Sequence, residues 1–219
     1  MNIFIVHAHE NELSFCSALK NKAKEFYSSR GNHVVISDLY RMNFNPVAGK
    51  NDFKNLSGAE YYKLQAEQVH AYQNNLFAEE IKREMEKLEK ADIVIFNFPL
   101  WWFSLPAILK GWVDRVFAMG YAYGAGKGVY ENGVFPNKKA FLAITTGGPD
   151  ISYQSQGKNG DIGTILFHIN HGILYFTGMR ALPPFIVYGP ARMSEDERKA
   201  KLQDYETYLG KLDSLRPLF

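Results

Sequence analysis

Three aromatic residues stand side by side in the segment Pro99–Ser104: Trp101, Trp102 and Phe103. Flat rings bind flat ligands, and stacking on an aromatic side chain can contribute a few kcal/mol when water is excluded. The alternative is core packing against the helix predicted to follow. Three consecutive rings cannot all point in one direction, however, so at least one should face a cleft or a partner chain. Their position therefore favours a binding role.

A second segment, TTGGPDISYQSQGKNG over residues 145–160, combines hydroxyl groups, amides, a tyrosine and four glycines. The adjacent Gly147 and Gly148 would let backbone N–H groups approach a ligand closely. The segment matches neither GxGxxG nor the lysine-containing phosphate loop. It could be an ordinary surface loop, but a loop of this length in a compact domain is more often functional.

A third segment, HAHENELSF over residues 7–15, places His7, His9 and Ser14 at the predicted start of a helix. Free N–H groups and the helix dipole could bind a phosphate there. A turn role for His9, bonded to nearby backbone, is equally consistent with the pattern. Two histidines with no suitably spaced carboxylate are a weak metal signal. Cys16 falls inside the helix, which favours burial over nucleophilic reactivity, and no GxSxG motif indicates a hydrolase.

The elements that would position these segments alternate along the chain. Strands are predicted over residues 2–6, 33–37, 92–98, 140–145 and 184–188, and helices over 12–31, 77–91, 105–117, 161–176 and 194–212. Residues 40–58 have no steady period and are predicted as loop. Ser194 and Glu197 have the spacing of a capping box. This alternation predicts an α/β fold, a parallel sheet with helices on both faces. Ligands bind beyond the carboxyl ends of such strands, where all three segments lie.

Composition narrows the function classes further. The 219 residues suit a single domain, and 46% of them are hydrophobic. Lys and Arg are scattered and the net charge is +2, so no nucleic-acid partner is indicated. No eighteen-residue apolar run exists, and the N-terminus lacks signal-peptide features, so no integral membrane segment is expected. A single cysteine excludes a disulfide framework and a zinc cluster, and a cytoplasmic location is expected.

Three long motifs carry a resemblance: SDLYRMNFNPV, FNFPLWWFSLPAILKGWVDRVF and ITTGGPDISYQSQGKNGD. Together they resemble the NAD(P)H:quinone oxidoreductase family (DT-diaphorase-like), and the resemblance runs along essentially the whole chain. It implies a flavodoxin-like fold with a five-stranded parallel sheet in the order 2-1-3-4-5. It also implies that residues 1–219 form one FAD-binding catalytic domain.

The resemblance implies where FAD would bind. The family positions along the flavin ring correspond to Leu100, Trp101, Trp102 and Phe103, and those around its polar edge to Thr145, Thr146, Gly147 and Gly148. The ribityl and pyrophosphate end corresponds to His9, Phe15 and Cys16, where Cys16 replaces the family's asparagine. Arg198 matches an arginine near the adenine. Asp114 matches a glutamate that reaches the neighbouring subunit's FAD, which implies a homodimer.

The chemistry implied by the resemblance is a two-electron transfer. NAD(P)H would give a hydride to the flavin and leave, and a quinone would then enter the same place, so the kinetics would be ping-pong. Tyr153 matches the tyrosine that stabilises charge on the reduced flavin. Asn159 stands where the family has a histidine, and an amide can donate a hydrogen bond but cannot carry a proton. The substrate pocket would include Tyr121, Tyr123 and Phe176.

Two other function classes fit the same fold. One is an ancillary regulatory flavoprotein that docks on a membrane transporter, which a pull-down with membrane proteins would test. The other is a one-electron carrier like flavodoxin. Such carriers are usually acidic so that they dock on basic partners, and the net charge of +2 argues against this class.

Overall fold

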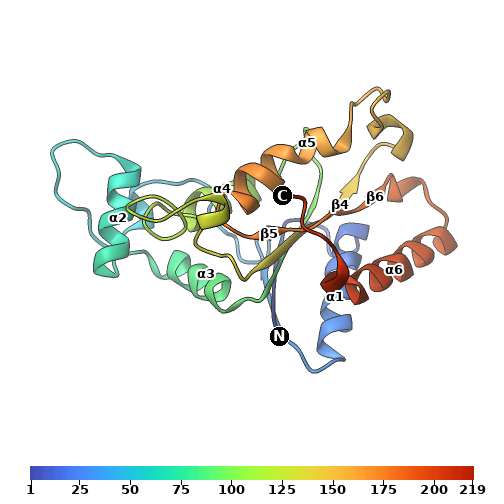
Figure 1. Ribbon diagram of the computed structural model, residues 1–219, viewed down its shortest axis with the longest axis horizontal. Helices are drawn as coiled ribbons and strands as arrows, with labels where there is room; N and C mark the ends of the chain where they lie inside the picture. The colour runs from blue at the N-terminus through green and yellow to red at the C-terminus, as the bar shows by residue number, and fades with distance from the viewer.

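The computed structural model describes all 219 residues and centres on one parallel sheet (Figure 1). Its strands are β1 (Asn2–His7), β2 (His33–Asp38), β3 (Ile93–Pro99), β4 (Lys139–Thr146), β5 (Arg180–Ala181) and β6 (Phe185–Tyr188). The order is β2-β1-β3-β4-β5, and β6 also pairs with β4. β5 pairs with the start of β4 and β6 with its end, so the two share one position. The predicted flavodoxin-like order is confirmed.

The fifth position is split because Pro183 and Pro184 lie between β5 and β6. Proline has no N–H to donate and interrupts a ladder of hydrogen bonds. Only the stretch Pro184–Tyr188 was predicted as a strand. The two-residue β5 was missed because a run that short carries no alternation of apolar and polar residues.

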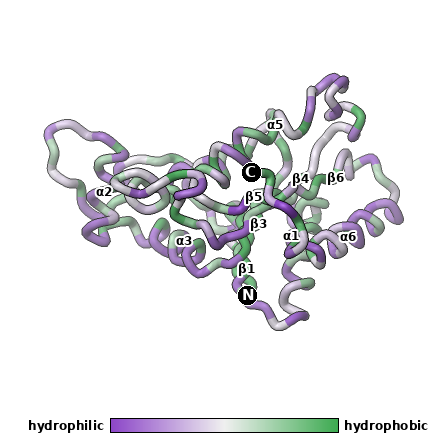
Figure 2. Tube along the Cα trace, viewed as in Figure 1, coloured by the Kyte–Doolittle hydropathy of each residue, from purple (hydrophilic) through white to green (hydrophobic).

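Helices cover both faces of the sheet, and alternate strand residues point to each. α1 (Phe15–Ser28) and α6 (Glu195–Gly210) pack on the face that carries Ile3 and Ile5. The other face, with Phe4 and Val6, is covered by α3 (Glu79–Lys90), α4 (Ala107–Val116) and α5 (Ile162–Ile169). Figure 2 shows the hydrophobic strands at the centre and polar residues along the outer sides of α3 and α6. Strands buried on both faces are nearly uniformly apolar, as β3 is.

Helix ends follow the local signals in the sequence. Ser194 Oγ accepts a hydrogen bond from Glu197 N at 3.2 Å, and Ser194 N donates to Glu197 Oε2 at 2.7 Å, so the predicted capping box of α6 is confirmed. Ser14 caps α1 by accepting from Ser17 N at 3.0 Å. Short 3₁₀ turns occupy Lys50–Asp52, Tyr130–Asn132, Asp150–Tyr153, Pro190–Arg192 and Leu212–Ser214.

Two helical segments differ from the sequence-based expectation. α2 (Leu64–Asn74) was not predicted, because the residues it buries are Glu67, Gln68 and Ala71, which form no apolar stripe. The helix predicted over residues 161–176 is α-helical only to Ile169, and Asn170–Tyr175 is a π-helix. π-helices are rare and occur mostly at functional sites.

Residues 40–76 and 117–134 form a lobe beside the sheet, and its helix α2 projects at the left of Figure 1. Arg115 joins the lobe to the body: its Nε lies 2.8 Å from Asp52 Oδ1 and its Nη1 2.9 Å from Glu80 Oε2. Gly111 leaves room for the chain at Pro46, whose carbonyl oxygen lies 2.1 Å from where a Cβ would stand. The lobe is thus attached at defined points.

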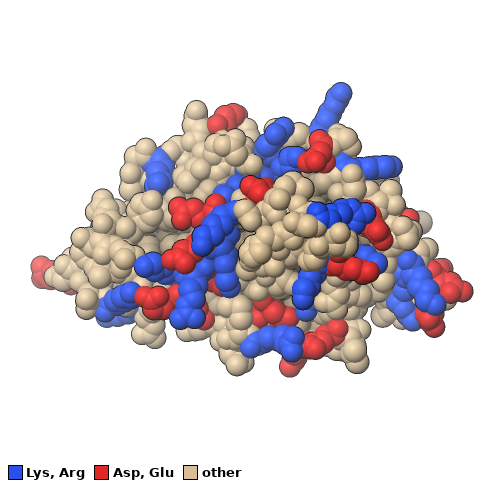
Figure 3. All heavy atoms as spheres, turned by 90° about the horizontal axis from the view of Figure 1, so that it is seen from below, with Lys and Arg blue, Asp and Glu red and all other residues tan.

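The outer surface is mixed in charge. Figure 3 shows lysine and arginine interspersed with aspartate and glutamate on the face that it presents. None of the helices is both long and apolar enough to cross a membrane.

Candidate active site

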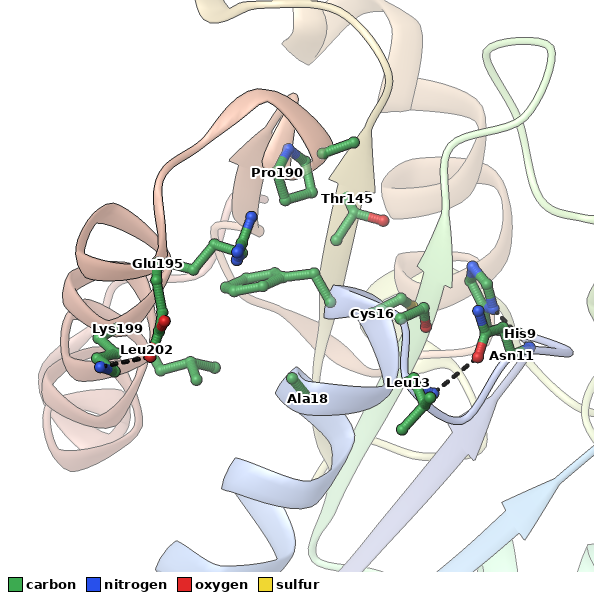
Figure 4. A pocket seen from close by; sticks show the side chains of 14 residues that line it. His9, Asn11, Leu13, Cys16, Ala18, Thr145, Pro190, Glu195, Lys199 and Leu202 are labelled. Carbon is green, nitrogen blue, oxygen red and sulfur yellow. Dashed lines mark hydrogen bonds and ion pairs between the residues drawn. The ribbon is translucent and has the colours of Figure 1, made fainter.

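A cavity of about 670 Å³ opens between α1 and α6 at the carboxyl edge of the sheet. Figure 4 shows Cys16 at the start of α1, Thr145 at the end of β4, Pro190 after β6 and Leu202 on α6 around one hollow. We name it the α1–α6 cavity. It brings together five of the expected cofactor residues: His9, Phe15, Cys16, Thr145 and Arg198.

The start of α1 in this cavity is suited to an anion. The backbone N–H groups of Phe15 and Cys16 make no hydrogen bond within the chain. The first turn of α1 holds no acidic residue, so the positive end of the helix dipole is not neutralised. Arg198 adds a guanidinium, anchored by a hydrogen bond from Nη1 to Met193 O at 2.6 Å. Free N–H groups, a helix dipole and an arginine are the features that bind phosphates.

His7 lies beneath this cavity, fully buried. Its Nδ1 lies 2.5 Å from Asn97 Oδ1, and its Nε2 lies 3.3 Å from Ser17 Oγ. Burial, reinforced by the charge of Lys20, lowers the pKa of His7 to about 4, so the ring is neutral at pH 7. His7 therefore fixes strand β1 to β3 and α1 rather than carrying protons for a ligand.

His9 and Cys16 also have defined roles. His9 Nδ1 accepts a hydrogen bond from Asn11 N at 3.0 Å, so the expected turn role is present although the ring also lines the cavity. Its pKa is lowered, chiefly by burial. Burial raises the pKa of the Cys16 thiol to about 12, and the residue is 1% exposed. The expectation that Cys16 is buried is confirmed, and the raised pKa keeps it in the thiol form at pH 7.

A second hollow of about 450 Å³ adjoins the first through Thr145. It is lined by Pro99, Leu100, Trp101, Trp102, Thr145, Thr146 and Gly147. Trp102 is 95% exposed, and Trp101 and Phe103 are each about half exposed. The expectation that not all three rings enter the core is confirmed.

The backbone of residues 100–104, which we name the aromatic loop, is strained. Trp102 and Phe103 have φ values of +49° and +58°, in the left-handed region. Bulky residues rarely adopt it, and each such residue costs on the order of 1–3 kcal/mol. Strain of this kind accumulates at ligand sites, and here it holds two large rings in solvent beside a hollow.

Tyr153 and Asn159 meet at Gly148, next to the second hollow. A Cβ on Gly148 would stand 3.1 Å from Tyr153 Cε2 and 3.5 Å from Asn159 Nδ2. The N–H groups of Gly147 and Gly148 make no hydrogen bond within the chain. A phenol, an amide and two free N–H groups therefore converge on one place, and all four can donate hydrogen bonds to a negatively charged edge.

A third hollow of about 270 Å³ lies between α4 and the π-helix. Its lining includes Lys110, Asp114, Tyr123 and Phe176. The rings of Tyr123 and Phe176 are 5.7 Å apart, and Lys110 Nζ lies 2.6 Å from Asp114 Oδ1. No lining residue is shared between this hollow and the other two. Within one chain, the expected pocket residues Tyr123 and Phe176 are thus separate from the aromatic loop.

Comparison with known proteins identifies the fold and the family. Residues 1–209 match a family model described as a flavodoxin-like fold. The chain is 41% identical to rat ribosyldihydronicotinamide dehydrogenase [quinone] over 99% of this chain and 94% of the relative, and 42% identical to rat NAD(P)H dehydrogenase [quinone] 1 over 98% and 78%. A crystal structure described as a quinone reductase from Klebsiella pneumoniae superimposes with a TM-score of 0.96 at 36% identity, covering 100% of this chain and 87% of that one. The chain belongs to the NAD(P)H:quinone oxidoreductase family.

One residue matched to the family's pocket wall is placed elsewhere. Tyr121 is only 4% exposed, its hydroxyl donates to Met85 O at 3.0 Å, and its ring packs on Phe135. Within one chain it belongs to the core and does not line the third hollow, because its ring packs against Tyr72 and Phe135. Tyr123 does line that hollow.

Other contacts beside these hollows escaped sequence reasoning. Tyr130, in the glycine-rich stretch, has φ +55° and places its ring 5.5 Å from that of Phe176. Gln65 Nε2 donates to the hydroxyl of Tyr123 at 3.2 Å. Ser104 bonds to His168 beside the aromatic loop. Each contact joins residues tens of positions apart, and no local pattern in the sequence signals such pairs.

Proposed function

We propose that the protein is an FAD-dependent NAD(P)H:quinone oxidoreductase. The observation that carries the proposal is that the second hollow, with its exposed rings, and the α1–α6 cavity, with its free N–H groups, are neighbours that share Thr145 in their linings. A flavin nucleotide has a flat ring system at one end and phosphates at the other, so it would match both hollows at once. Family membership supports the same activity.

The size of the α1–α6 cavity favours FAD over FMN. A single phosphate would be satisfied at the N-terminus of α1. The cavity extends beyond that point to Phe15, Leu202 and Arg198, an aromatic, an aliphatic and a cationic side chain. These groups suit an adenine and a second phosphate.

The chain's own residues have distinct tasks in this proposal. FAD, when bound, supplies two-electron transfer between NAD(P)H and a quinone. Trp102 and Phe103 offer their faces and edges to the ring system. Gly147, Gly148 and Tyr153 place donors where negative charge develops, which is the most effective form of electrostatic stabilisation. Asn159 adds an amide donor that cannot change its protonation state. Donor and acceptor would use one place in turn, which gives ping-pong kinetics.

A homodimer would complete the site. Tyr123, Phe176 and Asp114 lie in a hollow that is separate from the aromatic loop of the same chain. In a two-fold dimer, one such hollow on each chain can face the loop of the other. Light scattering should then give a particle of about 50 kDa, twice the 25.0 kDa of the chain. A fully active 25 kDa species would contradict the dimer.

The test of the function is chemical identification of the cofactor together with turnover. Acid should release FAD from the purified protein, with about one FAD per chain, and NADH or NADPH should reduce quinones with parallel double-reciprocal plots. Release of FMN alone would overturn the choice of nucleotide. A protein that neither contains nor binds a flavin would overturn the proposed function.

A further inference from the structure

A side-chain hydrogen bond joins the end of the aromatic loop to a helix 64 residues later in the chain. Ser104 Oγ lies 3.0 Å from His168 Nε2, and His168 Nδ1 lies 2.9 Å from Ile165 O. A carbonyl oxygen only accepts, so Nδ1 must carry the proton toward Ile165. In the neutral ring, Nε2 is then an acceptor, and the hydroxyl of Ser104 donates to it. We name this contact the Ser104–His168 clasp.

The loop that the clasp closes needs support. Trp102 and Phe103 stand in the left-handed region, Trp102 is almost fully exposed and Phe103 about half exposed, and their N–H groups make no hydrogen bond within the chain. Backbone bonds hold only the two ends: Leu100 N donates to Thr145 O at 2.8 Å, and Ser104 N to Trp101 O at 3.0 Å. The second of these bonds stays inside the loop. The clasp ties that end to α5, a separate element.

We propose that Ser104 and His168 are positioning residues that hold the aromatic loop in its strained, ligand-ready shape. The identity of the ligand, FAD, rests on the proposed function. When only a fraction of the free protein has the competent loop, the apparent dissociation constant rises by the inverse of that fraction. Loss of an exposed hydrogen bond of ordinary strength changes such a population by about three- to tenfold.

Flavin titration of the apoprotein tests the proposal. S104A and H168A should each raise the dissociation constant for FAD about three- to tenfold, and the double variant S104A/H168A no more than either one. H168Q, whose Oε1 can stand in for Nε2 as acceptor, should bind FAD within about twofold of the native chain. Independent effects that multiply in the double variant, or a failure of H168Q to restore binding, would overturn the proposal.

Amide exchange in the apoprotein separates this proposal from the proposed function. The exchange protection of the amide at residue 104, which donates to Trp101 O inside the loop, should fall several-fold in S104A and H168A relative to the native chain and H168Q, with the unfolding midpoint unchanged. If the native chain binds no flavin, the proposed function fails, and the exchange rates still decide whether the clasp holds the loop. Equal exchange in all variants would show that it does not.

Discussion

The interactions that hold the sheet body together differ from those that attach the lobe to it. The body buries apolar residues on both faces of its strands, in two clusters that between them contain most of the core. The lobe also contributes apolar residues to the larger cluster, among them Phe44, Phe53 and Phe117, but the Arg115–Asp52–Glu80 ion pairs fix where it attaches to the body. Apolar packing is tolerant of sequence, whereas buried ion pairs demand particular partners.

The difference matters for function because the two regions hold different parts of the proposed site. The body carries the α1–α6 cavity, with its phosphate-binding features, on β1, β4, α1 and α6. The lobe carries Tyr123, braced by Gln65. Changes that destabilise the body should therefore weaken cofactor binding. Changes in the lobe should instead alter the substrate range and the pairing of chains.

The largest expected effect comes from breaking the attachment of the lobe. Arg115→Met would leave Asp52, which is 1% exposed, as a buried charge without its partner. Removing one member of a buried pair typically costs about 3–5 kcal/mol. Urea unfolding should show a loss of this size. Lys201→Ala is the control, because its pair with Asp204 is exposed and should contribute under about 1 kcal/mol. A loss below about 1 kcal/mol for Arg115→Met would refute the assignment of the lobe to polar attachment.

Two tryptophans sharpen the contrast between packing and binding. Trp112 is fully buried and donates from Nε1 to Glu84 Oε2 at 2.8 Å, so Trp112→Ala should cost about 3–5 kcal/mol of unfolding free energy. Trp102→Ala should leave stability within about 0.5 kcal/mol, because the ring is 95% exposed. It should instead weaken FAD binding by about 1–3 kcal/mol through lost stacking. A Trp102→Ala protein that purifies fully loaded with FAD would argue against the ring as a flavin platform.

The same contrast explains what the sequence could predict. The strands of the body are apolar runs between helices of period 3.6, so their order and the carboxyl edge followed from pattern and resemblance. Glu67 and Gln68 of α2 are buried polar residues, which a hydrophobic pattern cannot reveal. The loops after β1, β3 and β4 were found because His9, Trp102 and Gly147, respectively, are unusual residue types at strand ends. Contacts such as Ser104–His168 join residues that come together only when the chain folds, so no local pattern in the sequence reveals them.

Acid should weaken the body through His7. Its folded pKa of about 4 lies below the unfolded value near 6.5, so between these pH values the unfolded chain holds a proton that the folded chain lacks. Stability from this residue is therefore full above pH 6.5 and is lost as the pH falls. The slope is about 1.4 kcal/mol per pH unit, or about 2 kcal/mol between pH 6.5 and 5. In unfolding measured across this range, His7→Gln should remove most of the slope, and the lowered pKa of His9 accounts for a remainder of the same sign. His33→Gln, an exposed control, should retain it.

Asn159 should leave the chemistry without an ionisation near pH 6–7. Its amide does not titrate, and the pKa values of both His7 and His9, near the α1–α6 cavity, are lowered by burial. Stopped-flow rates of flavin reduction by NAD(P)H should be flat through that range. Asn159→His should introduce one ionisation near the ordinary histidine pKa and leave FAD binding unchanged. The cost of the native amide should be smaller than the 2.7–4 kcal/mol typical of a lost donor, because a donor remains. If the rate of flavin reduction in the native protein already changes with an ionisation at pH 6–7, another group carries the proton.

The smallest effect is expected at two tyrosines whose rings stack 6.3 Å apart between α6 and the sheet. The hydroxyl of Tyr208 donates to Pro183 O at 2.6 Å, whereas the buried hydroxyl of Tyr205 has no hydrogen-bond partner. Tyr208→Phe should cost about 1 kcal/mol, since it removes a made bond and leaves a carbonyl unpaired. Tyr205→Phe should be neutral or stabilising by up to about 1 kcal/mol, because the hydroxyl was desolvated without compensation. Thermal unfolding of the two variants, which differ from native by one oxygen each, measures the contrast directly. A loss of about 1 kcal/mol or more in Tyr205→Phe would mean that a buried water or another group satisfies that hydroxyl, and that the apolar body contains a polar link of the kind that fastens the lobe.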